Sequence, residues 1–222
     1  MQKFTTAAPI AAVLDIPVGR LRFIAADRAD TTVEILPADA SRGRDVTAAE
    51  RTTVAYADGI LRIAAAAPRN RILGGSGSVE VTVRLPTGSR VEARTASAEI
   101  RGVGRLGDVT IDSAHGAIKL DETAGARLAL QAGDITVGRL GGSAEITTQK
   151  GGVHVTEAVR GTVVLRTQAG DISVGAARGT RATLDAGTSY GRIRNALTHD
   201  GSGRDLTLHA TTAYGDIAAR SL

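Results

Sequence analysis

The stretch Val163–Val174, VVLRTQAGDISV, recurs with variations through the second half of this 222-residue chain. Each copy carries a Gly-x-Ile step or a close variant, whose aliphatic residue falls at positions 100, 118, 135, 153, 172, 193 and 217, at spacings of 18, 17, 18, 19, 21 and 24. A fixed period near twenty that is filled with β-forming residues and glycine is typical of a solenoid, in which successive coils stack on one another. The repeat therefore predicts about seven coils of parallel β-solenoid.

The repeat also places apolar residues on one face of each strand. Val163 and Leu165 lie seven and five positions before Gly170, and they share a strand face because side chains alternate along a strand. The hydroxyl of Thr167 lies on the same face, and Gly170 provides a corner where the chain can adopt a positive φ angle. We therefore predict that like residues of successive coils stack into a narrow aliphatic core.

The first part of the chain is less regular, and we expect residues 1–78 to form a strand-rich N-terminal cap on a solenoid of residues 79–222. Asp58-Gly59 between alternating runs predicts a hairpin over Val54–Ile63. Residues 38–53 are expected to form a loop or one short helix, and residues 68–78 a loop rich in glycine. The other expected strands of the cap are residues 12–16, 19–24 and 31–36.

Composition narrows the class of protein. The chain has no Trp, two Phe and three Tyr, which fits a narrow core, and it has no Cys, which excludes disulfides and zinc–thiolate sites. The net charge of +4 comes mainly from arginines interspersed with acids, so specific nucleic-acid binding is not expected. No apolar run approaches the roughly 18 residues of a membrane span, and the start lacks a signal-peptide core. We expect a cytoplasmic protein, placed at the cell surface only if a leader or anchor was removed.

A family resemblance rests on two motifs. At Val83–Gly88, VRLPTG, followed by repeated Thr-x-x-Gly-Asp-Ile as in Thr167–Ile172, the chain resembles the bacterial putative-adhesin family of β-strand-repeat proteins, a domain of unknown function. The resemblance covers about residues 79–222 and departs from the usual pattern at Ala98 and Gly152. It implies a right-handed parallel β-solenoid after a strand-rich region, and an adhesive role with no catalytic residues to carry over.

Tyr190 and Tyr214 occupy the same repeat position, and Arg192 and Arg194 follow nearby. Stacked aromatic residues beside guanidinium groups form a candidate site for a ligand or partner. Aromatic packing at the tapering end of a solenoid is the alternative explanation for the two tyrosines.

A row of carboxylates follows the corner glycines at Asp134, Asp171 and Asp216. Carboxylates on neighbouring coils can bind calcium, whereas an aspartate in a tight turn can instead bond its own backbone. We expect the second role, with no metal and no cofactor. Outward-facing acids such as Glu145 are expected to form exposed ion pairs with Arg127 or Arg166 instead of a catalytic cluster.

These patterns favour a non-enzymatic, adhesin-like structural module that presents a surface to a protein or glycan partner. The alternative is an enzyme or a biosynthetic accessory protein with a site at the junction of cap and solenoid, near residues 68–78. Leu206, Leu208 and Ile217 are expected in the final coil, whose open end exposes backbone groups and aliphatic rows. We therefore expect a homo-oligomer formed through a coil end or edge.

Overall fold

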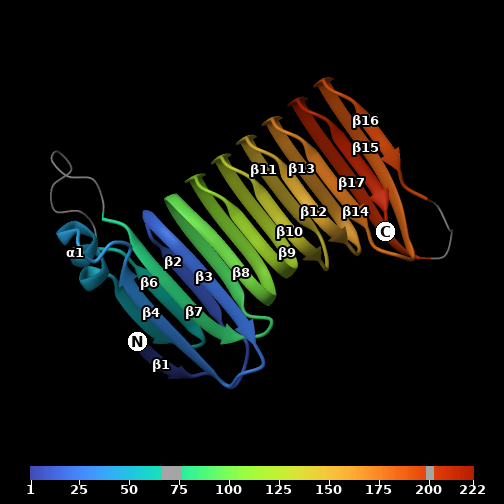
Figure 1. The fold of residues 1–222 in the computed structure, drawn as a ribbon. Coiled ribbons are helices and arrows are strands. Elements are labelled where there is room, and N and C mark those ends of the chain that lie inside the picture. Colours follow the sequence, from blue (N-terminus) through green and yellow to red (C-terminus); the bar gives the residue numbers. More distant parts are fainter. Residues whose placement is uncertain (67–76, 199–202) are drawn as a thin grey trace.

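The computed structural model describes residues 1–66, 77–198 and 203–222, and this part of the chain is all-β with one short helix (Figure 1). The predicted all-β class is confirmed, and the strands form an open sheet that does not close into a barrel. Within the described residues, no helix is long and apolar enough to cross a membrane.

The elements of the first part of the chain are β1 (Gln2–Thr5), β2 (Ala11–Asp15), β3 (Val18–Ala26), β4 (Asp30–Pro37), α1 (Gly43–Arg51), β5 (Thr53–Ala57), β6 (Ile60–Ala64) and β7 (Val79–Pro86). The strands of the repeats are β8 (Arg90–His115), β9 (Ile118–Ala132), β10 (Ile135–Leu140), β11 (Ala144–Lys150), β12 (Val153–Ala158), β13 (Gly161–Ala169), β14 (Ile172–Ala176), β15 (Thr180–Tyr190), β16 (Ile193–Ala196), β17 (Arg204–Tyr214) and β18 (Ile217–Ser221).

Each regular repeat supplies one strand to each of two strand rows. In the first row, β11 pairs in parallel with β9 and β13, and in the second row β12 pairs in parallel with β10 and β14. The register places equivalent residues opposite each other, so that Ile135 lies between Ile118 and Val153. Figure 1 shows the resulting elongated stack of strands. Because like residues lie side by side, each layer offers the next one a matching surface.

The core consists of the inward residues that the repeat predicts. Val163, Leu165 and Ile172 are almost completely buried. Thr167 is also buried, and its hydroxyl donates to the carbonyl oxygen of Gly151 at 3.0 Å, so the inward polar group has a partner in the neighbouring repeat. At the corner, a Cβ on Gly170 would collide with that same carbonyl oxygen. The corner glycines are therefore required by the close approach of successive layers.

The last two repeats do not stack in chain order. β17 pairs in parallel with both β13 and β15, and β18 pairs with both β14 and β16. The end of the stack is consequently β15 and β16, while the C-terminal repeat lies one layer inside it (Figure 1). This corrects the expected open end, because Leu208 and Ile217 of the C-terminal repeat are fully buried.

The N-terminal end shows the same inversion. β2 pairs in parallel with β6 and β8, and β3 pairs in parallel with β7 and β8, so the first parallel layer lies inside the second. Antiparallel strands then cover this end, with β5 on β6, β4 on β7 and β1 on β4. The parallel layers thus include part of the predicted cap, and the division of the chain at residue 78 stays a prediction.

Local predictions in the cap can be compared with the structure directly. Asp58 and Gly59 have φ angles of 51° and 75°, and they connect β5 to β6 as the predicted hairpin. The short helix expected between residues 38 and 53 is α1. The predicted loop at residues 68–78 falls largely on residues 67–76, which lie outside the described residues.

Candidate binding face

Tyr190 and Tyr214 end the strands β15 and β17 and lie opposite each other in the parallel register. Their ring centroids are 5.0 Å apart and their planes differ by 4°, so the rings are stacked. The two residues are 68% and 60% exposed, although both carry large apolar rings. A stacked pair of exposed rings with polar hydroxyls is a surface that suits binding. The structure therefore brings together the two tyrosines that the repeat alignment singled out.

The two predicted arginines have different surroundings. The Arg192 backbone N–H donates to Asp216 Oδ1 at 2.9 Å, and the Arg192 guanidinium lies 3.5 Å from Asp216 Oδ2. Arg194 lies on β16 opposite Ala218 and is exposed. Arg192 is therefore fixed to the neighbouring repeat just beyond the tyrosines. That these residues bind a partner stays a prediction.

A shallow groove of about 560 Å³ runs from Tyr214 along the corner of the first strand row. Tyr214 lies opposite Ala169, which is followed in the register by Lys150 and Ala132. Ala169 leaves room between Tyr214 and the Lys150 side chain, and Ala132 separates Lys150 from His115 at the far end of the groove. Amide side chains from three successive repeats line the same groove, namely Gln131, Gln149 and Gln168.

The chemistry of this groove follows from its lining. Each glutamine amide both donates and accepts hydrogen bonds, and the three amides recur at the strand spacing of about 4.8 Å per repeat. Tyr214 adds an aromatic ring and Lys150 adds a positive charge. Such a lining suits a ligand that has many hydroxyl groups and flat apolar faces.

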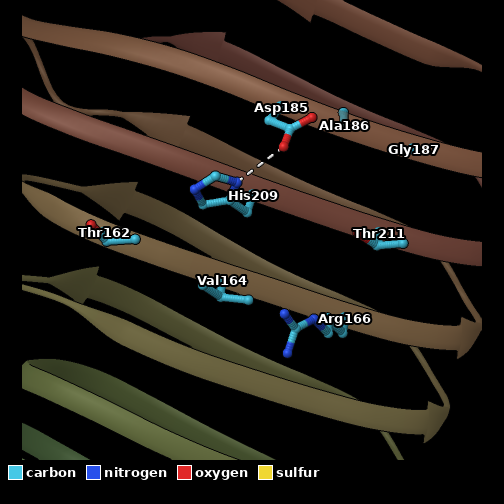
Figure 2. Close-up of a pocket in the computed structure, with 8 residues that line it drawn as sticks. All are labelled: Thr162, Val164, Arg166, Asp185, Ala186, Gly187, His209 and Thr211. Atoms are coloured by element: carbon cyan, nitrogen blue, oxygen red, sulfur yellow. Dashed lines mark hydrogen bonds and ion pairs between the residues drawn. The ribbon is translucent and has the colours of Figure 1, made fainter.

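A second hollow of about 510 Å³ lies on the outer face of β13, β17 and β15 (Figure 2). His209 on β17 lies between Val164 on β13 and Asp185 on β15, and its Nδ1 is 3.2 Å from Asp185 Oδ2. Arg166 occupies the next outward position on β13, opposite Thr211. We call the residues that line the groove and this hollow, together with Tyr190, the binding face.

The predicted exposed ion pairs are present around Glu145. Its Oε1 is 3.7 Å from Arg166 Nη1, and its Oε2 is 3.6 Å from Arg127 Nη2. Because all three side chains are about half exposed or more, these pairs contribute little to the free energy of folding. The two guanidinium groups nevertheless lie beside the Glu145 carboxylate and balance its negative charge next to the binding face.

The aspartate row joins neighbouring repeats through backbone hydrogen bonds. Asp134 Oδ1 accepts the N–H of Gly152 at 2.8 Å, and Asp171 Oδ1 accepts the N–H of Asp216 at 2.8 Å. The expected brace therefore exists, but each carboxylate bonds the next repeat in the stack and not its own turn. Among the described residues, no group of three or more His, Cys, Asp or Glu side chains is arranged to hold a metal ion.

The junction that the enzyme hypothesis requires is partly described. A hollow of about 230 Å³ is formed where β6 and β2 meet β8, and Asp15, Arg62, Glu92 and Arg94 line it. The guanidinium of Arg94 lies 3.5 Å from Glu92 Oε1. The glycine-rich segment 67–76, which that hypothesis also invokes, lies outside the described residues.

Sequence reasoning missed the hollow around His209 because it assumed that repeats stack in chain order. His209 and Val164 become neighbours only because β17 lies against β13. One signal is available in the sequence: the strand position of His209 holds Val164 and Asp185 in the two other repeats, so all three can be expected to point outward. The sequence does not show in which order the three repeats lie along the stack.

A protein-family model described as Toastrack DUF4097 matches residues 19–221. A search of curated proteins finds no match. Among solved structures, a putative adhesin from Parabacteroides distasonis is similar with a TM-score of 0.49 and 13% identity, covering 98% of this chain and 95% of that one. A putative adhesin from Bacteroides fragilis is similar with a TM-score of 0.45 and 12% identity, over 98% of this chain and 95% of that one.

Proposed function

This chain belongs to the Toastrack DUF4097 family, and from that premise we propose that it is a non-enzymatic, adhesin-like interaction module. The binding face is the proposed contact surface, and its proposed partner is a glycan. A protein partner is the other outcome that the experiment below distinguishes.

One observation carries this proposal: the stacked and exposed pair Tyr190 and Tyr214 stands at the end of a groove lined by glutamine amides. Sugar rings combine apolar C–H faces with hydroxyl groups at their edges. Aromatic rings can cover the apolar faces while amides exchange hydrogen bonds with the hydroxyls. The groove is shallow and runs across successive strands, along the axis of the stack, which suits a chain of sugar rings better than one small molecule.

The state of the nearby carboxylates supports binding over catalysis. Hydrolysis of a glycosidic bond requires two carboxyl groups that flank the bond. Around the binding face, Glu145 faces two guanidinium groups, Asp185 contacts the His209 ring, and Asp216 accepts a backbone N–H. These acids are engaged in fixing the surface.

We further propose that the stack is a right-handed parallel β-solenoid. The parallel pairs β9–β11–β13 and β10–β12–β14 support this assignment, since each pair joins neighbouring repeats of the chain. Connections between parallel strands of one sheet are right-handed in about 98% of cases. A crystal structure of the chain tests the handedness directly.

The functional proposal is tested by probing a glycan microarray and a protein array with the full chain. We expect glycan binding that Tyr214→Ala weakens about tenfold or more, as removal of a central aromatic contact does. Tyr214→Phe should retain most of the affinity because the ring remains. Gln149→Ala should weaken binding by a smaller factor, since one of three amides is lost.

Leu36→Ala is the matched control, because Leu36 is an exposed apolar residue, 48% accessible, on β4 at the other end of the molecule. It should leave binding unchanged. Glycan binding that Tyr214→Ala leaves unchanged would contradict the proposed surface. Tyrosine-dependent capture of a protein, with no glycan bound, would replace the glycan by a protein partner.

A further inference from the structure

The strands β15 and β16 form an uncovered edge of the sheet. In the described part of the chain, β15 pairs in parallel with β17 and β16 with β18, and neither has a strand on its other side. An uncovered edge presents backbone donors and acceptors that another strand can use. The 11 residues of β15 make this edge long enough to bind a complete strand.

The edge also exposes the residues that continue the core rows. Ile193 on β16 is 45% exposed, whereas Ile217, its neighbour in the register, is fully buried. Leu184 on β15 is partly buried, whereas Leu208 opposite it is fully buried. The end layer has the same apolar pattern as an interior layer, but no strand of the described residues covers it.

The direction of the backbone groups decides which residues of β15 face the edge. The carbonyl oxygen of Tyr190 accepts the N–H of Gly215, so Tyr190 points its backbone groups toward β17. Because this direction alternates along a strand, Thr183 and Asp185 point theirs toward the open edge. A strand that joins the edge must therefore bond at these odd-numbered positions.

We propose that the occupant of this edge is a second copy of the chain, whose β15 pairs antiparallel with the first around a two-fold axis through Thr183. In this register Arg181 lies opposite Asp185 of the second copy, and the reverse pair forms at the same time. Ala182 and Leu184 of the two copies lie together on the core side. The pairing thus combines two opposite-charge pairs with continued apolar rows.

Charge favours this register over the neighbouring one. A two-fold axis through Asp185 also matches the directions of the backbone groups, but it places two Asp185 carboxylates directly opposite each other, which destabilises a strand pair. Arg181 also lies 3.6 Å from Asp205 of its own chain, so in the dimer it is shared between two carboxylates.

The dimer has a consequence for the binding face. An axis perpendicular to the sheet keeps the outer faces of both copies on the same side of the joined sheet. Two grooves then face one ligand, and a polymeric glycan can engage both of them, which raises the apparent affinity without a new contact. Because one pair of edge strands buries little surface, we expect association in the micromolar range.

The test is the molar mass of the full chain in solution by analytical ultracentrifugation from about 1 to 500 µM, the range in which weak interfaces dissociate. We expect a monomer–dimer equilibrium. Thr183→Lys should shift the chain to monomer, since it places two like charges at the two-fold axis. Thr207→Lys is the matched control, because Thr207 lies opposite Thr183 on β17, one layer inside the edge, and it should leave the dimer intact.

The register has its own test. Asp185→Arg alone and Arg181→Asp alone should each weaken the dimer, and the double variant should restore it because the pairs re-form with reversed charges. Circular dichroism confirms that each variant keeps its strands. A chain that stays monomeric throughout the range, or a dimer that Thr183→Lys leaves unchanged, overturns the proposal. Failure of the double variant to recover overturns the register.

Discussion

The two ends of this stack are built from similar parallel layers but are finished differently. At each end, the first or last repeat of the chain lies one layer inside, with β2 and β3 covered by β6 and β7, and β17 and β18 covered by β15 and β16. At the N-terminal end, antiparallel strands β4 and β5 then cover the parallel layers. Among the described residues, no strand covers the C-terminal end.

This difference leaves the N-terminal end closed by antiparallel strands and the last parallel layer of the C-terminal end exposed. The N-terminal end converts its edge into antiparallel pairs and adds the helix α1, whose buried Asp45 accepts the N–H of Ser78 at 3.0 Å. The C-terminal end keeps an uncovered layer and places Tyr190 and Ile193 there, both of them exposed. Ile193, whose counterpart Ile217 one layer inside is fully buried, is therefore accessible from outside.

The largest expected effect comes from removing the C-terminal repeat, residues 204–222. If β15 and β16 form the outer layer, this deletion leaves them without a neighbour and uncovers β13 and β14. We expect a loss of stability beyond the roughly 4–5 kcal/mol that bounds most single substitutions. Hydrogen exchange should show that residues 180–196 lose their protection. Retained protection of that segment would show that β15 and β16 can also pack directly against β13 and β14.

A matched pair of single substitutions also tests whether β17 and β18 lie inside β15 and β16 in the stack. Ile217→Ala removes a fully buried side chain only a few residues from the end of the chain, and it should cost about 2–5 kcal/mol. Ile193→Ala removes the neighbouring side chain in the register, which is 45% exposed, and it should cost about 1 kcal/mol or less.

Urea denaturation of both variants gives the two free energies of unfolding. Equal costs, or a greater cost for Ile193→Ala, would contradict the inverted order of the last two repeats.

Sequence alone could predict the layers but not their order. The period of the Gly-x-Ile step and the alternation in Val163–Val174 determine which residues face inward, and Leu165 and Ile172 are buried as expected. The inversion at the C-terminal end escaped prediction because each repeat carries the same pattern. The layers of Ile217 and Ile193 carry the same sequence pattern, so periodicity cannot predict which of them packs against β14.

The sequence likewise predicts only the part of the binding face that does not depend on the order of the layers. Tyr190 and Tyr214 belong to adjacent layers in either order, so their stacking followed from the alignment. The hollow around His209 depends on contact between β17 and β13, and no local signal in the sequence contains that contact. The outcome for Asp171 lies between these cases: its bracing role was expected, but its partner is the N–H of Asp216, from the repeat that the inversion brings next to it.

Substitutions of Asp45 and Asp171 compare the same kind of hydrogen bond, from a backbone N–H to a carboxylate, toward the two ends of the stack. Asp45→Ala removes a buried carboxylate and leaves the partly buried N–H of Ser78 without its acceptor, and we expect a cost of about 1.5–3 kcal/mol. Asp171→Ala removes the acceptor of the Asp216 N–H, but water can replace it there, so we expect about 0.5–1 kcal/mol. Thermal denaturation of both variants measures the difference. A cost for Asp171→Ala that matches that of Asp45→Ala would show that the C-terminal end is as firmly closed as the N-terminal one.

The smallest expected effect concerns the acid response of the N-terminal edge. Asp30 on β4 contacts Arg28 Nε at 2.7 Å and Lys3 Nζ at 3.0 Å, and Lys3 belongs to the edge strand β1. Hydrogen bonds from Arg28 and then Lys3 lower the pKa of Asp30 from 3.8 to about 2. A carboxylate whose pKa is lower in the folded state stabilises the fold above its unfolded pKa, and this contribution disappears as the pH falls from about 4 to about 2.

Asp30→Asn should therefore lower the urea midpoint slightly at pH 6 and flatten its decline between about pH 4 and pH 2, because the amide does not titrate in this range. Arg28→Gln should retain part of the decline, since Lys3 still lowers the pKa of Asp30. Because Asp30 is only partly buried and Lys3 is exposed, the ion pair contributes little to the free energy of folding, and the change should be the smallest of the four. A decline that is equally steep in Asp30→Asn would show that the antiparallel β1–β4 edge does not depend on this carboxylate.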